Sequence, residues 1–233
     1  RRKKGLLTWL IYSWLERRAL KHADEVIFVD SRAKEAYLKR FPRIHAQVIP
    51  PGVGAHFFTP LSKTRARSAL KLPSRKGILV FIGRLEPEKN IPRIIREVES
   101  FTDPPLLLII GEGRDRKEVE QAVTKKSTRI LGNVANDLLP TYLAAADALV
   151  LMSESEGLPT VILESFAAGT PVIARDVGDV GKLVKNKTGY LVEFGAMEKA
   201  YLRINACDAK SCRKRAKDYA WPAISKKLEE VYG

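Results

Sequence analysis

The chain has 233 residues, of which 45% are hydrophobic and 29% charged, so it can bury a sizeable core as one or two domains and is not a disordered chain. It holds no run of about eighteen apolar residues, and its basic start lacks the small-residue cleavage site of a signal peptide, so we expect a cytoplasmic protein. The formal net charge of +14 suits three kinds of partner: a nucleotide diphosphate, an anionic membrane face or a nucleic acid.

The first predicted element is a basic amphipathic helix at residues 6–20, which carries Trp9 and Trp14 among lysines and arginines. Two interpretations of it remain open. Residues 1–20 can lie in the headgroup region of an anionic membrane, as a peripheral contact, or the helix can pack on the neighbouring strand with its charges outward.

The next elements are a strand at residues 26–29, a helix at 31–39 with Ser31 as its cap, and a strand at 47–49. Two strands cannot form an independent doubly wound sheet. We therefore interpret residues 1–60 as the remnant of a first domain. The proline- and glycine-rich run at 50–60 and the basic run that follows predict a crossing to a second domain, with a linker at 61–76.

From Gly77 onward the pattern is a regular alternation of apolar strands and helices, which predicts an α/β doubly wound parallel sheet of Rossmann-like type at residues 77–221. The tail is helical and basic, with a break near Trp221 and a last helix at residues 222–233. The predicted strands are 78–82, 106–110, 128–131, 148–151, 172–174 and 190–192. The predicted helices are 92–100, 116–125, 137–145, 160–168, 180–184 and 196–205.

Two carboxylates flank the start of the helix at 160–168. Glu156 lies in the loop between strand and helix, and Glu164 lies roughly 7 Å beyond the N-terminal amides of the helix. A diphosphate bound by the free N–H groups at this helix start would place a ribose near Glu164 and a sugar near Glu156. The stretch therefore predicts a nucleotide-sugar site.

Four stretches resemble, in the same order, the motifs of glycosyltransferase family 4: Ala-Asp-Glu-Val-Ile-Phe-Val at 23–29, Val-Ile-Pro-Pro-Gly-Val at 48–53, Gly-Arg-Leu-Glu-Pro-Glu-Lys-Asn at 83–90, and the pair Glu156 and Glu164. The resemblance implies a retaining, metal-independent enzyme of GT-B architecture without a cofactor. It implies transfer of a hexose, of mannose or glucose type, from a UDP- or GDP-sugar to a glycan or lipid-linked acceptor. It also implies that the last helix returns to the N-terminal, acceptor-side domain.

The resemblance assigns Arg84, Lys89 and Glu156 as the catalytic set. In the family, the cations that match Arg84 and Lys89 bind the diphosphate and stabilise it as a leaving group, which agrees with the negative charge that develops on departure. Gly83 lets the backbone approach the ligand. The alternative is that both cations pair with Glu86 and Glu88 on a solvated loop.

The remaining donor-binding residues follow from the same resemblance. Glu156 contacts the transferred sugar and Glu164 the ribose hydroxyls, while Gly111 and Glu112 line the donor cleft and Val134 lies against the base. For Val134 a plain turn is the alternative. The helix start supplies backbone contacts to the phosphates, but Pro159 lacks an N–H, so its neighbours must donate. These neighbours are Thr160 and Val161, and Gly157 and Leu158 complete the predicted donor-binding residues.

The sequence suggests three functions. The first is the glycosyltransferase, and the second is a nucleotide-sugar-binding module that has no activity of its own and needs a partner chain. The third is an electrostatic nucleic-acid binder, which we do not expect because the sequence lacks a base-reading motif or an aromatic platform.

Overall fold

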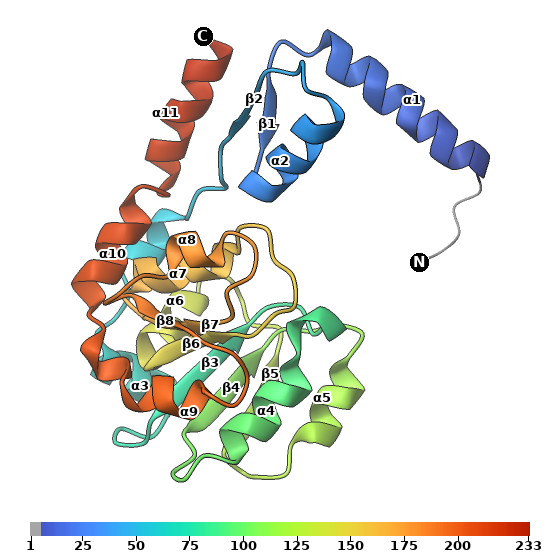
Figure 1. The fold of residues 1–233 in the computed structure, drawn as a ribbon. Coiled ribbons are helices and arrows are strands. Elements are labelled where there is room, and N and C mark those ends of the chain that lie inside the picture. Colours follow the sequence, from blue (N-terminus) through green and yellow to red (C-terminus); the bar gives the residue numbers. More distant parts are fainter. Residues whose placement is uncertain (1–5) are drawn as a thin grey trace.

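The computed structural model describes residues 6–233, which form a small N-terminal unit and a larger α/β unit (Figure 1). The predicted basic start at residues 1–4 lies outside the described residues. The small unit contains α1 (Leu6–His22), β1 (Val26–Phe28), α2 (Ser31–Arg40) and β2 (Ala46–Val48). Its two strands pair in parallel.

Helix α1 extends away from the body of the molecule (Figure 1) and exposes its large apolar side chains. Trp9 and Trp14 are 59% and 60% exposed. Residues 9–12 are all apolar or aromatic and, at about 3.6 residues per turn, they point in every direction around the helix. The predicted single apolar face is therefore wrong, and so is its packing on the neighbouring strand.

Helix α2 is capped by Asp30, and the prediction of Ser31 as the cap is wrong by one residue. Asp30 has extended backbone angles, and its carboxylate accepts a hydrogen bond from the Ala33 N–H at 2.8 Å. Capping requires these two features together, because the cap lies just outside the helix and its side chain replaces a missing acceptor. Ser31 is the first helical residue, and its hydroxyl is bound elsewhere.

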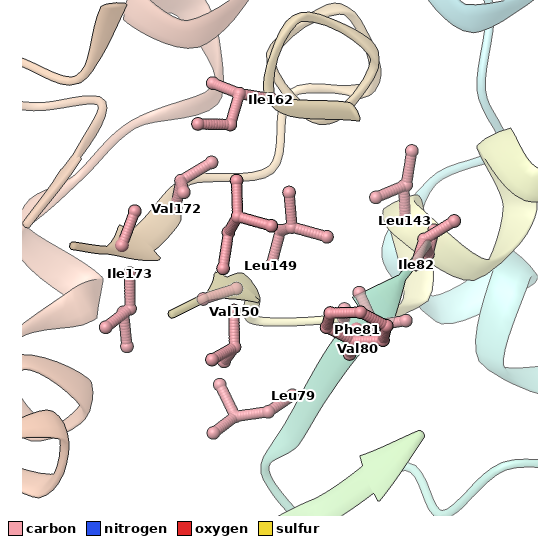
Figure 2. Packing of buried hydrophobic residues seen from close by; sticks show 14 of the residues in the cluster. Leu79, Val80, Phe81, Ile82, Leu143, Leu149, Val150, Ile162, Val172 and Ile173 are labelled. Carbon is pink, nitrogen blue, oxygen red and sulfur yellow. The ribbon is translucent and has the colours of Figure 1, made fainter. Parts of the chain in front are cut away.

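The larger unit is built on six parallel strands in the order β5-β4-β3-β6-β7-β8. Their near-continuous apolar sequences agree with a sheet that is covered on both faces. Figure 2 shows Ile162 of α7 beside Leu149 and Val172 on one side of the sheet, with Leu79 and Val150 toward the other. The strands are β3 (Ile78–Ile82), β4 (Leu106–Ile110), β5 (Thr128–Gly132), β6 (Ala148–Leu151), β7 (Val172–Ala174) and β8 (Gly189–Leu191).

The helices cover the sheet in two layers. On one face α6 packs against α3 and α7, and α7 packs against α10, while α4 packs against α5 and α9 on the other. The α-helices of this unit are α3 (Lys63–Ala69), α4 (Ile91–Glu99), α5 (Arg116–Ala122), α6 (Leu139–Ala145), α7 (Thr160–Ala168), α8 (Val180–Leu183), α9 (Met197–Leu202) and α10 (Ala209–Lys217). The last helix, α11 (Trp221–Tyr232), leaves the sheet and lies on the side of the small unit (Figure 1). Short 3-10 turns are η1 (Ala55–Phe58), η2 (Pro87–Lys89) and η3 (Ile204–Ala206).

Apart from shifts of one to three residues at the ends of elements, two predicted stretches differ from the structure. The segment predicted as a linker contains α3, whose Arg67 is buried, donates to the Ala145 carbonyl at 2.9 Å and pairs with Asp147 at 3.0 Å. The helix predicted at 196–205 is divided into α9 and η3. The predicted break near Trp221 is present, since α10 ends at Lys217 and α11 begins at Trp221.

The chain passes between the two units twice, near Val53 and again near Trp221, and these two segments lie side by side. Val53 donates to the Tyr219 carbonyl at 2.7 Å, and Trp221 donates back to the Val53 carbonyl at 3.3 Å. Gly52 lies so close to Trp221 that a Cβ at this position would be 2.5 Å from the indole ring. The segment around Gly52 and Val53 and the start of α11 are therefore held together by backbone hydrogen bonds and close packing.

Candidate active site

The strand order reverses between β3 and β6, and the predicted donor residues gather at the carboxyl ends of these strands. Open α/β sheets bind ligands at such a switch point. A hollow of about 290 Å³ lies there and is called the β3–β6 hollow. It is lined by Phe81, Ile82, Gly83, Arg84, Lys89, Leu151, Glu156, Leu158, Pro159, Thr160 and Val161.

A second hollow of about 260 Å³ continues from the first around Gly83 and Arg84, and is called the β3–β5 hollow. A Cβ at Gly111 would lie 1.9 Å from the Gly83 carbonyl oxygen, so the two loops touch through their backbones and only glycine fits at Gly111. The hollow is lined by Ile82, Gly83, Arg84, Ile110, Gly111, Glu112, Asn133, Val134 and Leu139. The structure thus gathers most of the predicted donor residues around one rim.

Larger hollows lie elsewhere, including one of about 620 Å³ beside Arg67 and Tyr201. It is also lined by Gly77 and Asp147, which precede β3 and β6, so it lies at the amino ends of the strands. Position in the sheet, and not volume, therefore identifies the β3–β6 hollow as the candidate site.

Arg84 presents an unpaired cation to both hollows. Its side chain is exposed and makes no hydrogen bond or ion pair within residues 6–233. Glu86 and Glu88 are instead bound by Arg114, at 2.7 and 3.8 Å. The alternative in which these two carboxylates neutralise Arg84 and Lys89 is therefore wrong.

Lys89 and Glu156 form an ion pair of 2.6 Å with side chains only 16% and 11% exposed. The Ser153 hydroxyl donates to the same carboxylate oxygen at 2.6 Å. The two loops are also joined by the Asn90 amide, which donates to the Met152 carbonyl at 3.1 Å. The sequence predicts Lys89 and Glu156 as separate site residues and not as an ion pair. Ser153 was not among the predicted donor-binding residues, although it lies two residues after β6, on the predicted rim.

Helix α7 begins directly after Pro159, which is its N-terminal cap residue. Ile162 donates to the Pro159 carbonyl at 3.1 Å. The N–H groups of Thr160 and Val161 are therefore the free donors of this helix start within the described residues. Both residues line the β3–β6 hollow, so an anion there would meet the positive end of the helix dipole.

Glu164 lies on the same face of α7 as Thr160 and Val161, about 6 Å along the helix. It borders neither hollow directly. Burial raises the pKa of Glu164, and no hydrogen bond or ion pair to its carboxylate is present in residues 6–233. A half-buried carboxylate without a partner is costly, which is typical of a group that a ligand completes.

Gly157 borders neither hollow and is enclosed by protein on two sides. A Cβ at Gly157 would lie 2.8 Å from the Asp30 carboxylate of the small unit. Its carbonyl accepts the Asp179 N–H at 2.9 Å. Glu112 borders the β3–β5 hollow, but its carboxylate is bound by Arg116 at 2.7 Å. No cluster of histidine, cysteine, aspartate and glutamate within residues 6–233 could hold a metal ion.

Comparison with known proteins identifies the family. Residues 62–220, more than half of the chain, match the family model "Glycosyl transferases group 1". The chain is a member of this family. The resemblance inferred from the four sequence motifs is thereby confirmed, as is the Rossmann-like sheet of the GT-B donor domain.

Relatives in this family are longer than the chain. It is 34% identical over 169 residues to a putative teichuronic acid biosynthesis glycosyltransferase, TuaC, of Bacillus subtilis. The matched stretch covers 72% of this chain and 42% of the relative. It is 31% identical to a GDP-mannose-dependent phosphatidylinositol monomannoside mannosyltransferase of Mycobacterium tuberculosis, over 78% of this chain and 52% of the relative. The chain thus spans about half of these proteins.

Solved structures of similar fold include sucrose-phosphate synthase of Thermosynechococcus elongatus, with a TM-score of 0.79 and 28% identity over 94% of this chain and 60% of that one. HepE of Anabaena, in complex with UDP and glucose, has a TM-score of 0.81 and 21% identity over 98% of this chain and 67% of that one. At 21% identity the likeness to HepE shows the fold alone.

Proposed function

We propose that this chain is the donor-binding half of a retaining glycosyltransferase. It transfers a hexose of mannose or glucose type from a UDP- or GDP-sugar to a glycan or lipid-linked acceptor. The single observation that carries the proposal is the set of open groups at the switch point of the sheet: the unpaired Arg84 cation, the free N–H groups that start α7, and the partnerless Glu164.

These groups match the parts of a nucleotide-sugar. Arg84 and the start of α7 receive the diphosphate, and they oppose the negative charge that grows as the bond between sugar and phosphate breaks. Glu164 accepts hydrogen bonds from the ribose hydroxyls, since an ionised carboxylate offers two acceptor oxygens. The base lies in the β3–β5 hollow against Val134, next to Gly111 and Glu112.

Lys89 and Glu156 hold the sugar end. Glu156 contacts hydroxyls of the transferred sugar, while Lys89 holds that carboxylate in place through their 2.6 Å contact and reaches toward the diphosphate. The leaving phosphate assists same-face attack by the acceptor hydroxyl, and no metal ion or cofactor takes part. Gly83 and Leu158 border the hollow and shape the backbone around the phosphates, and Gly157 joins this backbone to Glu156.

A narrower alternative is a nucleotide-sugar-binding module without activity of its own. It is favoured by the small unit, whose two-stranded sheet is far short of a doubly wound domain, and by relatives about twice as long. In that case the acceptor groups come from a partner chain. Binding without transfer is its expected signature.

The test titrates the 233-residue chain with UDP, GDP, UDP-glucose and GDP-mannose in a thermal-shift assay. A ligand at a hundred times its dissociation constant adds about 2.7 kcal/mol, or roughly 5–10 °C for a chain of this size. Arg84→Ala should remove this shift. Arg114→Ala, which removes a neighbouring cation that binds Glu86, should leave it unchanged. Absence of any shift in the wild-type protein would end the proposal, and release of free nucleotide with an added glycan acceptor separates enzyme from module.

We also propose that residues 1–20 make a peripheral contact with an anionic membrane on the cytoplasmic side, which suits a lipid-linked acceptor. The proposal is supported by the exposed Trp9 and Trp14, with Arg17 and Arg18 on the same helix. No helix among the described residues is long and apolar enough to cross a bilayer. Flotation with phosphatidylglycerol vesicles should recover the wild-type protein and leave a Trp9→Ser/Trp14→Ser variant in solution; equal recovery of both contradicts the contact.

A further inference from the structure

A buried carboxylate outside the donor site joins the small unit to the sheet domain. Asp179, in the loop between β7 and α8, is only 5% exposed at its side chain. Its oxygens accept the Ser31 N–H at 2.9 Å, the Ser31 hydroxyl at 2.6 Å and the Lys182 ammonium at 2.9 Å. Lys182 also donates to the Ser31 hydroxyl. Figure 1 shows one end of α2 above α8.

The same loop lies directly on the backbone of the donor loop. The Asp179 N–H donates to the Gly157 carbonyl at 2.9 Å. A Cβ at Gly178, where φ is +62°, would lie 2.1 Å from the Glu156 carbonyl oxygen. No side chain fits there, so the backbone at 178–179 supports the peptide groups at 156–157 without a gap.

The opposite side of the donor loop is covered by the small unit. Asp30 caps α2 with one carboxylate oxygen, and its other oxygen faces Gly157. Gly157 is therefore held between Asp30 and the loop of Asp179, and Ser31 links these two supports. The β1–α2 loop therefore contacts the peptide that follows Glu156 both through Asp30 and through Ser31 and Asp179.

We propose that Asp179 is a positioning residue that clasps the β1–α2 loop onto the donor loop and so fixes Glu156 for the sugar part of the donor. The proposal rests on the proposed function in one respect, namely that Glu156 contacts the sugar. Nucleotide alone is bound mainly by Arg84, the start of α7 and Glu164, none of which, in the described part of the chain, forms a hydrogen bond or ion pair with Ser31, Asp179 or Lys182, so its affinity should change far less.

The chemistry of the clasp requires a charged carboxylate. Burial by itself would raise the pKa of Asp179, but hydrogen bonds from Ser31 and the contact with Lys182 outweigh it, so the pKa lies below its usual value. In Asp179→Asn one acceptor oxygen becomes an NH₂ group, which faces either the Ser31 N–H or the Ser31 hydroxyl and the Lys182 ammonium. Two donors then oppose each other at a buried position, and the contact opens.

The experiment compares how strongly each variant prefers a nucleotide-sugar to its nucleotide, using UDP-glucose with UDP and GDP-mannose with GDP. Asp179→Asn should reduce this preference about tenfold, equal to about 1.4 kcal/mol, while nucleotide alone binds within about twofold of wild type. Asp218→Asn is the matched control, because this exposed aspartate borders the same hollow as Asp179 and Lys182 and lies outside the clasp. It should change neither value.

Hydrogen exchange supplies a readout that is independent of ligand. Amides at residues 26–40 should exchange faster in Asp179→Asn than in wild type or Asp218→Asn. Should Asp179→Asn fail to fold, Ser31→Ala replaces it, because it removes the hydroxyl and keeps the backbone bond; its loss of preference should be about threefold.

An unchanged preference together with unchanged exchange in a folded Asp179→Asn protein overturns the clasp. Unchanged preference with faster exchange also overturns the positioning role, since the loop would then open without moving Glu156. If the wild-type protein binds none of the four ligands, the proposed function fails instead. The exchange measurement then still decides whether Asp179 joins the two units.

Discussion

Replacement of Glu164 by glutamine should raise the stability of the ligand-free protein and lower its affinity for nucleotide. An unsatisfied buried polar group costs about 1–3 kcal/mol, and more when it is charged. Because Glu164 keeps some exposure, we take the low end, about 1 kcal/mol, as the gain from removing its charge. A gain of this size raises the melting temperature by roughly 2–4 °C in a chain of this length.

The pH dependence of this gain has a definite sign. Burial raises the folded-state pKa of Glu164 above its unfolded value of about 4.3. Ionisation at neutral pH therefore penalises the folded state, and the penalty disappears as the pH falls through the raised pKa. The difference in melting temperature between Glu164→Gln and wild type should be largest at neutral pH and should narrow toward pH 4.

Nucleotide affinity should fall in Glu164→Gln, although the stability of the ligand-free protein rises. A hydrogen bond to a charged acceptor contributes about 1.5–3 kcal/mol, so loss of the ribose contact should weaken nucleotide binding roughly ten- to hundredfold. Glu118→Gln, an exposed glutamate in the first turn of α5, is the control and should change neither property. A lower melting temperature in Glu164→Gln with unchanged nucleotide affinity would refute both the unpartnered carboxylate and its role at the ribose.

Two further predictions follow from single side chains. Asp30→Ala removes the cap of α2 and should destabilise the protein by about 1 kcal/mol in urea unfolding, whereas Glu25→Ala, just before β1, should have little effect; equal losses would contradict the cap. Burial raises the pKa of Cys212 to about 12, so this thiol should resist a thiol reagent at pH 8 until urea unfolds the chain, and rapid labelling of Cys212 in the native protein would contradict its burial.

The sheet could be predicted from the sequence because each strand has a strong local signal. The apolar runs at 78–82, 106–110, 148–151 and 172–174 agree with β3, β4, β6 and β7 residue for residue. Strand β8 is displaced by one residue, since it begins at Gly189, which apolar character alone does not indicate. The environment of α1 could not be predicted, because burial depends on what lies opposite the helix and not on its own pattern.

The site was predictable where residues follow directly on strands and not where distant loops meet. Gly83, Arg84, Gly111 and Glu156 lie at the carboxyl ends of strands, and the parallel order alone brings them to one rim. Asp179 is far from this pattern. Its partner Ser31 is 148 residues away in sequence and belongs to the other unit, so no local spacing indicates the contact.

The charges of the rim divide into those already satisfied and those left open, and this division bears on what each can contribute to binding. Lys89 and Glu156 already neutralise each other in an ion pair of 2.6 Å with little exposure. A ligand that contacts them replaces or adds to this interaction, so the net gain in binding free energy is small. Arg84 and Glu164 begin without partners and gain a full contact when a diphosphate and a ribose arrive. Affinity should therefore depend mainly on the open pair, whereas the closed pair, fixed through Ser153 and the loop of Asp179, should govern the orientation of the sugar.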